Sequence, residues 1–495
     1  MKSANLIYKS ALIVFLGIMF SRILGYFSRV IIAREGLEIY GIYNLALFMV
    51  QFVIPLILLG LGTGLMRYLG HYDGKKQIKK KDIAITSSIS VVLVLSIVFF
   101  FFFFFFSQNI EYLFDKPGLA GFLRYFAFAI PFLSLISLLS SVLKSHNRIV
   151  SLVLVTSIIQ SILELVCLYF LFSLGYQSTA LIISVLLPNI LSLMLLVYYS
   201  KKDFSFNFTY FDKSLFYYSL PLMPIALVAS YLSLIDTIIL GYLSSATDVA
   251  IYNAGLPTSQ IVLIFSTALL TIFLPLISKK NSKGKNIIEE YVFVFRGILF
   301  ATAPFLIFSI LFSEQILISL FGEPYVSAAS SFIILTIAYS LYGLSLPAHN
   351  VLILRNKQKI LLYLTLGVLF INILLNFLLI PYSIEQFGNG AYGAALSKLV
   401  SLFILSLSII YSVKKLERFT IIDKDAYNII ISSLISMFGV YLMTKIVGVY
   451  STKMLLVYLI IYSMIYILLL YYMGFFKKQY YLPLRELMNF KKINY

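Results

Sequence analysis

The sequence predicts an all-α integral membrane protein with about fourteen transmembrane helices. The first observation is composition, because 61% of the 495 residues are hydrophobic and only 12% are charged. A soluble chain of this length would need many more polar residues to cover its surface. The second observation is that long apolar segments follow one another almost from end to end. The third is that nearly all positive charge falls on one side of these segments.

The apolar segments have the length that a membrane helix needs, about 20 residues. The run of Phe residues from 99 to 106 is one example, since no soluble helix could expose phenyl rings on every face. The loops between segments are short, and no gap is long enough for a soluble domain. We predict spans near residues 11–33, 39–66, 83–106, 121–143, 149–173, 178–200, 214–242, 249–277, 290–312, 326–351, 360–381, 391–413, 426–447 and 454–474.

The first of these segments is predicted to stay in the membrane. It is too long for a signal peptide, and no small-residue cleavage site follows it. Alternating loops then place most loop Lys and Arg residues on the side of the N-terminus, which the positive-inside rule makes cytoplasmic. Examples are Lys80, Lys144, Lys202, Lys283 and Lys415. Both termini are therefore expected in the cytoplasm, and the protein in the cell membrane as a multi-pass protein.

The same charge asymmetry accounts for the formal net charge of +18. A basic total can indicate nucleic-acid binding. Here the basic residues are spread over many short loops beside helix ends, so they are expected to contact anionic lipid headgroups. We predict membrane lipids as partners and no nucleic acid.

The residues that carry most enzyme and metal chemistry are sparse. Cys167 is the only cysteine, and the three histidines are far apart in the sequence, so no metal site is predicted. No Walker loop is present, so the chain is not expected to hydrolyse ATP. No catalytic residue and no cofactor is predicted, and the protein is not expected to be an enzyme.

An internal repeat divides the chain. Gly41-Ile42-Tyr43-Asn44 recurs as Ala250-Ile251-Tyr252-Asn253, an offset of 209 between positions 41 and 250. Asn147-Arg148 recurs as Asn356-Lys357 at the same offset. We predict an N-terminal six-helix lobe at 1–213, a C-terminal six-helix lobe at 214–421, and two extra helices with a cytoplasmic tail at 422–495. Because six is even, both copies enter the membrane in the same orientation, as parallel repeats.

Three segments resemble the oligosaccharide and polysaccharide flippases of the superfamily that also contains multidrug extruders, the MOP exporters. The first segment is FSRILGYFSRVIIAREGLEIYGIYNLA (20–46), in which Arg34, Tyr40, Gly41 and Tyr43 match the family pattern. The second is LIDTIILGYLSSATDVAIYNAG (234–255). The third is NILLNFLLIP (372–381), followed by GAYGAA (390–395). The resemblance spans most of residues 10–410.

The resemblance implies a fold like that of the multidrug (MATE) extruders, and a flippase that moves a lipid-linked oligosaccharide to the outer leaflet. Its substrate would be a polyprenyl-phosphate-linked sugar, with polysaccharide-assembly enzymes as candidate partners. An ion-coupled multidrug exporter is the alternative, although basic residues outnumber acidic ones within the spans. A membrane polysaccharide polymerase or ligase is the third hypothesis, and the lack of a large extracytoplasmic loop argues against it.

Ionisable residues inside spans are functional candidates, since burying one costs at least ~2.5–3.5 kcal/mol on insertion scales. Arg22 and Arg29 are seven residues apart and share one face of the first helix. Lys398 lies among small residues in the twelfth span. We predict that these three bind the substrate phosphate. The alternative is that they form static ion pairs or reach toward the membrane surface, as Arg124 and Arg296 can near helix ends.

Two acidic residues inside the spans are also functional candidates. When Arg34 is aligned with Gly241, at an offset of 207, Asp236 falls at the position equivalent to Arg29, which places opposite charges at equivalent depth. The difference from 209 implies a two-residue insertion in the loop of the second copy. That predicts a gating ion pair, and a static pair between lobes is the alternative. Glu164 lies in the middle of the fifth span, where it could pair with an arginine or bind a proton or cation. Asp236 and Glu164 are therefore predicted to serve gating or ion coupling.

Overall fold

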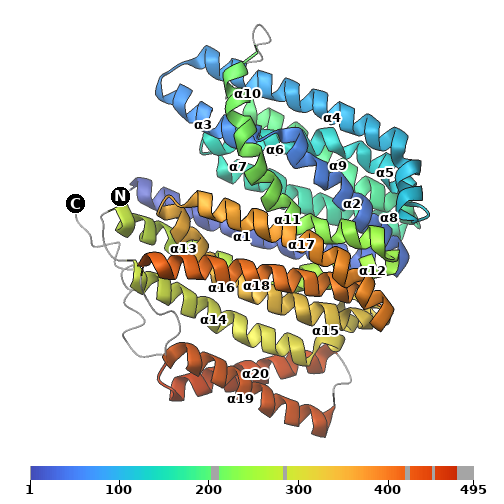
Figure 1. Ribbon diagram of the computed structural model, residues 1–495, viewed down its shortest axis with the longest axis vertical. Helices are drawn as coiled ribbons and strands as arrows, with labels where there is room; N and C mark the ends of the chain where they lie inside the picture. The colour runs from blue at the N-terminus through green and yellow to red at the C-terminus, as the bar shows by residue number, and fades with distance from the viewer. Residues whose placement is uncertain (1, 202–210, 283–286, 418–423, 449–451, 476–495) are drawn as a thin grey trace. The chain divides into compact units, whose positions relative to one another are not determined.

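The computed structural model describes residues 2–201, 211–282, 287–417, 424–448 and 452–475. Every regular element in these residues is a helix (Figure 1). Twelve helices are long and apolar enough to cross a membrane, and the number rises to 14 if each of two bent pairs is one span. Each of those 14 segments overlaps one span expected from the sequence, although the second ends at Leu58 and not at 66, so the predicted fold class is confirmed.

The chain forms two compact units. Unit 1 is Met1–Asn253 with Asn372–Ala394, and unit 2 is Ala254–Ile371 with Ala395–Tyr495. Three helices contribute to both units: α12 (Ala246–Ser259), α17 (Gln358–Phe387) and α18 (Gly390–Glu417). The predicted lobe boundary at 213/214 concerns the sequence repeat and stays a prediction. The boundary at 421/422 lies outside the described residues.

Unit 1 contains most of the helices of the N-terminal half. Its elements, in chain order, are α1 (Lys2–Ala33), α2 (Leu37–Leu58), α3 (Leu61–Gly74), α4 (Ile78–Phe114), α5 (Leu119–Ala127), α6 (Ala129–Ser145), α7 (Ile149–Val153), the π-helix η1 (Leu154–Ile159), α8 (Gln160–Ser173), α9 (Gln177–Ser200), α10 (Lys213–Ser219), the 3₁₀-helix η2 (Leu220–Leu222) and α11 (Met223–Leu243).

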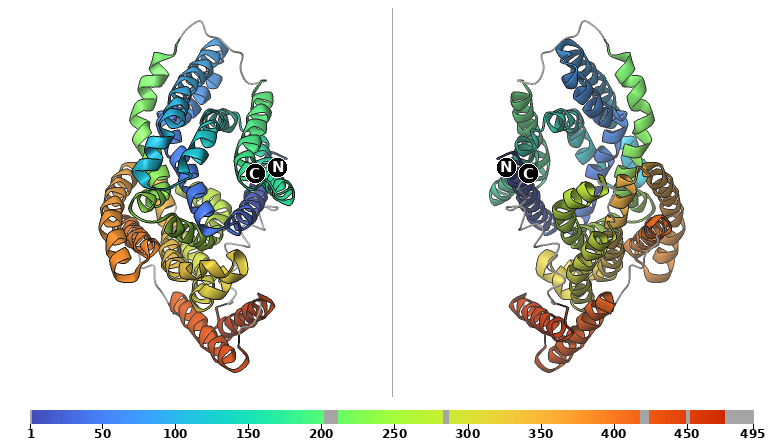
Figure 2. Two further views of the ribbon diagram at one scale, coloured as in Figure 1. Left: turned by 90° about the vertical axis from the view of Figure 1, so that its right-hand side faces the viewer. Right: turned by 90° about the vertical axis from the view of Figure 1, so that its left-hand side faces the viewer.

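Unit 2 contains the remaining helices. They are α13 (Val262–Ser282), α14 (Ile288–Leu311), α15 (Ser313–Phe321), the 3₁₀-helix η3 (Glu323–Ala328), α16 (Ala329–Leu354), α19 (Lys424–Val447) and α20 (Thr452–Tyr472). The last two helices, red in Figure 2, pair side by side. They pack on α14 through a core that includes Phe295, Leu299, Ile429 and Tyr466.

Two of the spans are bent. Helices α5 and α6 meet at 46° around Phe128. Pro131 follows in the first turn of α6, where it has no N–H to donate to the carbonyl of Ala127 and its ring crowds that carbonyl. Helix α5 therefore ends at Ala127. The second bent pair, 213–228 with 230–243, turns by 52°.

The local backbone repeats at the predicted offset of 209. Asn147 and Asn356 both have left-handed backbones, with φ values of 57° and 56°. The next N–H in each copy, of Arg148 and Lys357, donates to Leu143 O at 2.9 Å and to Leu352 O at 2.8 Å. The same helix C-cap thus ends the fourth and the tenth span. This agreement supports the internal repeat that the sequence indicated.

A close helix crossing in unit 1 explains one glycine of the repeated motif. A Cβ atom built on Gly41 of α2 would lie 1.9 Å from the carbonyl oxygen of Ala246 in α12. No larger residue fits without moving the two backbones apart. The neighbouring contact of Gly241 in α11 with Leu45 is also tight, at 2.4 Å from a built Cβ. Small residues therefore let α2 pack closely on α11 and α12.

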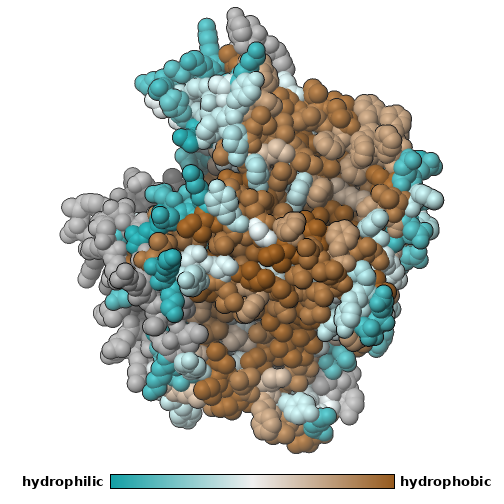
Figure 3. All heavy atoms as spheres, in the orientation of Figure 1, coloured by the Kyte–Doolittle hydropathy of each residue, from teal (hydrophilic) through white to brown (hydrophobic). Residues whose placement is uncertain are grey.

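The molecular surface has the polarity of a membrane protein. On the face shown in Figure 3, apolar side chains cover the middle of the helices, and hydrophilic side chains gather toward helix ends. The Phe run of α4 contributes exposed rings, among them Phe101 and Phe105. Helix α4 has 37 residues and is about 55 Å long at ~1.5 Å per residue, so its ends extend beyond a hydrocarbon core of about 30 Å.

Candidate functional site

Helix α1 presents two arginines on the side opposite its most exposed apolar residues. Phe20 and Phe27 are 45% and 54% exposed. Arg22 and Arg29 each follow one of these residues by two positions, which is about 200° around a helix. Both arginines are nevertheless exposed. They therefore lie on an open face of unit 1 that is not the apolar face of α1.

Helix α8 shows the same division into two faces. Val166, Tyr169 and Phe170 are exposed apolar or aromatic residues on one side. Glu164 lies two positions before Val166, about 200° away, and Gln160 shares the face of Glu164 because four residues separate them. Neither Gln160 nor Glu164 is fully buried. The acid predicted from the sequence thus lies on the non-apolar face of its helix.

The polar faces of α1 and α8 are neighbours. Ser21 Oγ and Ser161 Oγ are 2.8 Å apart, and the two helices pack along their lengths. The charge of Arg29 acts on Glu164 and also on Tyr43 of α2. The structure therefore brings together three of the predicted residues, Arg22, Arg29 and Glu164, in one region of unit 1.

Asp236 on α11 lies in a buried amide-lined environment. Its side chain is 1% exposed. Its Oδ1 accepts hydrogen bonds from Asn372 Nδ2 at 3.0 Å and Asn376 Nδ2 at 2.9 Å, both on the part of α17 that belongs to unit 1. The side-chain oxygens of Asn372 and Asn376 are buried and accept no hydrogen bond from the described part of the chain. Two amide nitrogens therefore converge on one carboxylate oxygen, and two buried amide oxygens lie on the same side chains.

A hydrogen-bonded network extends from this cluster toward α2. Thr237 Oγ1 donates to Asn253 Oδ1 at 3.4 Å, and Tyr40 OH donates to the carbonyl oxygen of Asn253 at 3.2 Å. Asn44 and Asn253, which are equivalent in the repeat, each donate to the carbonyl oxygen four residues earlier. The repeated Tyr-Asn pairs thus serve packing within unit 1.

The predicted pairing of Arg29 with Asp236 stays a prediction. The contacts described for Asp236 come from the amides of α17, whereas the charge of Arg29 acts on Glu164 of α8. Asn372 and Asn376 were not predicted from the sequence as partners of Asp236. Two asparagines four residues apart in an apolar span could have indicated a polar site, because this spacing puts both amides on one helix face.

Lys398 belongs to unit 2, on α18. Its side chain is 1% exposed, and Ser397 and Ser401 beside it are also buried. Its charge acts on Tyr342 of α16, and the neighbouring Tyr339 hydroxyl accepts a hydrogen bond from Gln260 Nε2 at 3.0 Å. Lys398 is thus covered in this conformation. Its predicted contact with a substrate stays a prediction.

Two further arginines have structural partners. Arg124 Nε donates to Ser107 Oγ at 2.9 Å. Arg296 of α14 lies 3.1 Å from Asp425 Oδ2 of α19, and both side chains are largely buried. These contacts hold neighbouring helices together, α4 with α5 and α14 with α19.

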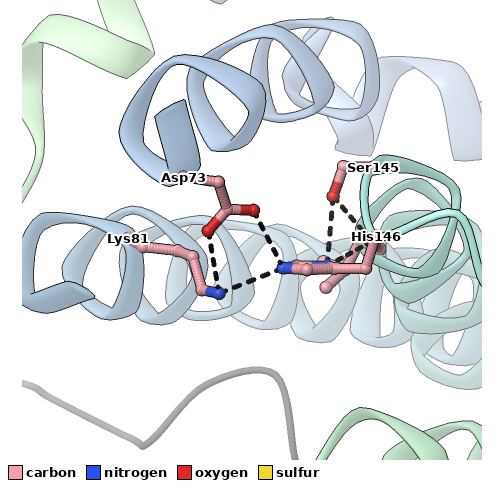
Figure 4. A network of polar contacts seen from close by, with 5 residues as sticks. Asp73, Lys81, Ser145 and His146 are labelled. Atoms are coloured by element: carbon pink, nitrogen blue, oxygen red, sulfur yellow. Dashed lines mark hydrogen bonds and ion pairs between the residues drawn. The ribbon is translucent and has the colours of Figure 1, made fainter. Parts of the chain in front are cut away.

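A separate polar cluster joins the predicted cytoplasmic ends of α3, α4 and α6 (Figure 4). Lys81 Nζ lies 3.1 Å from Asp73 Oδ1 and 3.1 Å from His146 Nε2. His146 Nδ1 is 2.8 Å from the carbonyl oxygen of Val142, which can only accept, so Nδ1 carries a proton. Within the described residues no group of three or more His, Cys, Asp or Glu side chains could hold a metal ion.

Comparison with known families shows to which protein family the chain belongs. Residues 36–330 match the model of a family described as polysaccharide biosynthesis protein. The chain belongs to this polysaccharide biosynthesis protein family. The match begins just before α2 and ends in α16, so it includes Glu164 and Asp236. No curated protein is significantly similar to the chain in sequence.

Solved structures share the fold of this family member. The lipid II flippase MurJ in an inward closed conformation has a TM-score of 0.77 at 19% identity, over 94% of this chain and 100% of that chain. An inward-facing multidrug resistance MATE transporter of the MOP superfamily has a TM-score of 0.65 at 13% identity, over 83% and 99%. A mutant of the Vibrio cholerae MATE transporter VcmN has a TM-score of 0.59 at 13% identity, over 86% and 98%. The predicted MATE-like fold is confirmed.

Proposed function

We propose that this protein flips a polyprenyl-phosphate-linked oligosaccharide from the cytoplasmic to the outer leaflet of the cell membrane, with both termini cytoplasmic. The family match supports a role in polysaccharide biosynthesis. The observation that carries the choice of substrate is the pair of arginines on the open face of α1. The proposed partners are the lipid-linked oligosaccharide itself, membrane lipids and enzymes of polysaccharide assembly.

The chemistry of such a substrate explains this arrangement. Its phosphate is anionic, its sugar is polar, and its polyprenyl chain can stay in the lipid. Two guanidinium groups about 10 Å apart along one helix face can follow an anionic group through part of the membrane, from a rise of ~1.5 Å per residue. Arginine suits this task because its planar fork binds phosphate oxygens by charge-assisted hydrogen bonds. In this proposal Lys398 contacts the phosphate in another state of the cycle.

The multidrug exporter is the second candidate, because the fold is shared with MATE transporters. A binding site for cationic drugs requires acidic groups that are not neutralised by neighbouring cations. On the open face of α1 and α8, Arg22 and Arg29 outnumber Glu164. The charge of this face therefore favours an anionic substrate over a cationic one.

Coupling to a cation is a further part of the proposal. The Asp236 carboxylate and the side-chain oxygens of Asn372 and Asn376 are hard oxygen groups of the kind that cations such as Na⁺ prefer. A buried acceptor without a donor costs about 1–3 kcal/mol, and a bound cation would remove that cost for both amides. We propose that a monovalent cation binds beside Asp236 and drives the transport cycle.

Transport by the purified protein in vesicles tests the function. A fluorescent polyprenyl-phosphate-linked oligosaccharide is placed in both leaflets, and a membrane-impermeant glycosidase is added outside. Without flipping only the outer pool is cleaved, whereas flipping exposes the inner pool as well. Arg22→Gln and Arg29→Gln should each slow this step by about tenfold or more, since a hydrogen bond to a charged group contributes about 1.5–3 kcal/mol.

Two controls make this result specific. Arg22→Lys and Arg29→Lys keep the charge and should retain part of the rate. Arg124→Gln removes a guanidinium that bonds Ser107 and should leave the rate close to that of the wild type. Uptake of ethidium by the wild-type protein without any flipping of the lipid-linked sugar would instead establish the drug exporter.

A further inference from the structure

The fifth span carries a polar face that phosphate binding does not explain. Gln160 and Glu164 lie on this face, opposite the exposed Val166, Tyr169 and Phe170. A membrane helix that needed only to pack would carry apolar residues there, because an ionisable group in a span is costly. The face is also incompletely buried, so it remains open to a ligand.

The backbone before this face is unusual. Residues Leu154–Ile159 form a π-helix, which includes one more residue per turn than an α-helix would. Such segments are frequent at functional sites, and they change which side chains share a face farther along the helix. Gln160 is the first residue after the π-helix. The insertion thus sets the direction in which Gln160 and Glu164 point.

The Gln160 amide is held in place from α9. Its Nε2 donates to Asn189 Oδ1 at 3.1 Å, and Asn189 is fixed in turn because its Nδ2 donates to the carbonyl oxygen of Val185 at 2.7 Å. No described residue donates a hydrogen bond to the side-chain oxygen of Gln160. The structure therefore presents an oriented amide that can still accept from a ligand, and its second N–H can donate.

The register of α1 against α8 places this face beside the arginines. Gly17 lies against Val153 and Ile158, and Ser21 lies against Ser161, so the two helices run parallel. Measured from the serine pair, Arg22 is about 1.5 Å, Glu164 about 4.5 Å and Arg29 about 12 Å farther along, from ~1.5 Å per residue. The backbone of Glu164 thus lies at a level between those of Arg22 and Arg29.

We propose that Gln160 and Glu164 bind the sugar attached to the phosphate and make the protein selective for a neutral sugar over an acidic one. This inference rests on the proposed function. With the phosphate on Arg29, about 7.5 Å along the axis from Glu164 at ~1.5 Å per residue, a sugar that extends toward Arg22 lies next to Gln160 and Glu164. An ionised carboxylate can only accept hydrogen bonds, which sugar hydroxyl groups can supply. A sugar carboxylate at this place would face a like charge, and such contacts strongly disfavour a wrong ligand.

Binding of defined lipids at pH 8 tests this selectivity. The full-length protein in detergent is titrated with polyprenyl diphosphate carrying either one N-acetylglucosamine or one glucuronic acid. The wild type should prefer the neutral sugar by at least about tenfold, because of like-charge repulsion. Glu164→Gln keeps the shape of the side chain and removes the charge, so this preference should fall toward unity. Gln160→Leu should weaken the binding of both lipids by the same factor.

Control variants and a third lipid, polyprenyl diphosphate alone, show whether the sugar-selectivity inference or the proposed function is wrong. Glu385→Gln removes an exposed carboxylate elsewhere in unit 1 and should leave the preference unchanged. Thermal unfolding and gel filtration show whether each variant is folded, and Glu164→Asp, which keeps the charge, should retain the preference. If the wild type binds both sugars equally, or if Glu164→Gln keeps the preference, this inference is wrong while the flippase proposal stands. If the wild type binds neither lipid nor polyprenyl diphosphate alone, the proposed function is wrong and the inference falls with it.

Discussion

At the residue scale, the ionisable side chains within the spans divide into two groups by what surrounds them. Arg22 and Arg29 are exposed on the non-apolar face of α1 and can meet a substrate directly. Asp236 is buried among amides, where bulk solvent and a large headgroup are excluded. The first environment suits recognition of an anionic substrate. The second suits binding of a small ion whose presence can favour one conformation over another.

The first prediction concerns this buried cluster. Asp236→Asn should reduce the dependence of flipping on a cation gradient by about tenfold or more, because it removes the negative charge that offsets a bound cation. Asn376→Leu should weaken the same dependence, since it removes one ligand oxygen. Flipping would be measured in vesicles with and without imposed Na⁺ and proton gradients. Glu385→Gln is the matched control, and a variant at position 236 that keeps the full gradient dependence would exclude the cation site.

At the element scale, close packing of short-side-chain residues and a few polar contacts hold the helices of each unit together. Gly41 lets α2 approach α12 within unit 1. Arg296 and Asp425 tie α19 to α14 within unit 2, and Tyr466 OH of α20 donates to the carbonyl oxygen of Phe300 at 2.9 Å. Such contacts matter in a membrane because lipid removes most of the hydrophobic driving force between helices.

The second prediction concerns the crossing at Gly41. Gly41→Ala should lower the free energy of unfolding by about 1–3 kcal/mol or more, the usual cost of overpacking. The added Cβ would meet the backbone of Ala246, which cannot rotate away. The control is Gly70→Ala in α3, where nothing lies within 4 Å of a built Cβ. There alanine should be neutral or stabilising by up to about 1 kcal/mol. Thermal unfolding in detergent measures both, and equal effects would argue against the close crossing.

The third prediction concerns the pair between Arg296 and Asp425. Either Arg296→Met or Asp425→Leu alone leaves a largely buried charge without its partner and should cost about 3–5 kcal/mol. The double variant should be markedly more stable than the sum of the single effects. A double-mutant cycle of unfolding free energies isolates this coupling. Additive effects would mean that the two side chains do not interact in the membrane.

At the scale of the whole molecule, the sequence predicts the helices much better than their partners. Hydropathy is a local property, so the positions of the candidate spans could be predicted, and the repeat placed Asn147 and Asn356 at equivalent helix ends. The amides around Asp236 come from α17, and the partner of Arg296 comes from α19. Such partners depend on tertiary packing, which hydropathy and repeat offsets do not encode. The π-helix before Gln160 likewise has no sequence signal that we recognise.

The last prediction concerns the orientation of the molecule in the membrane. Single cysteines at positions 144 and 415 should be protected from an impermeant thiol reagent added outside intact cells, whereas one at 385 should react, because the basic loops stay in the cytoplasm. Lys202 and Lys283, also expected in the cytoplasm, lie outside the described residues, so the labels are placed at Lys144 and Lys415. A Cys167→Ser background removes the native thiol. Permeabilised cells supply the positive control for the cytoplasmic positions. Labelling of position 415 in intact cells would reverse the topology, and flipping toward the outer leaflet would then have to be abandoned, because the arginines of α1 would enter the membrane from the opposite side.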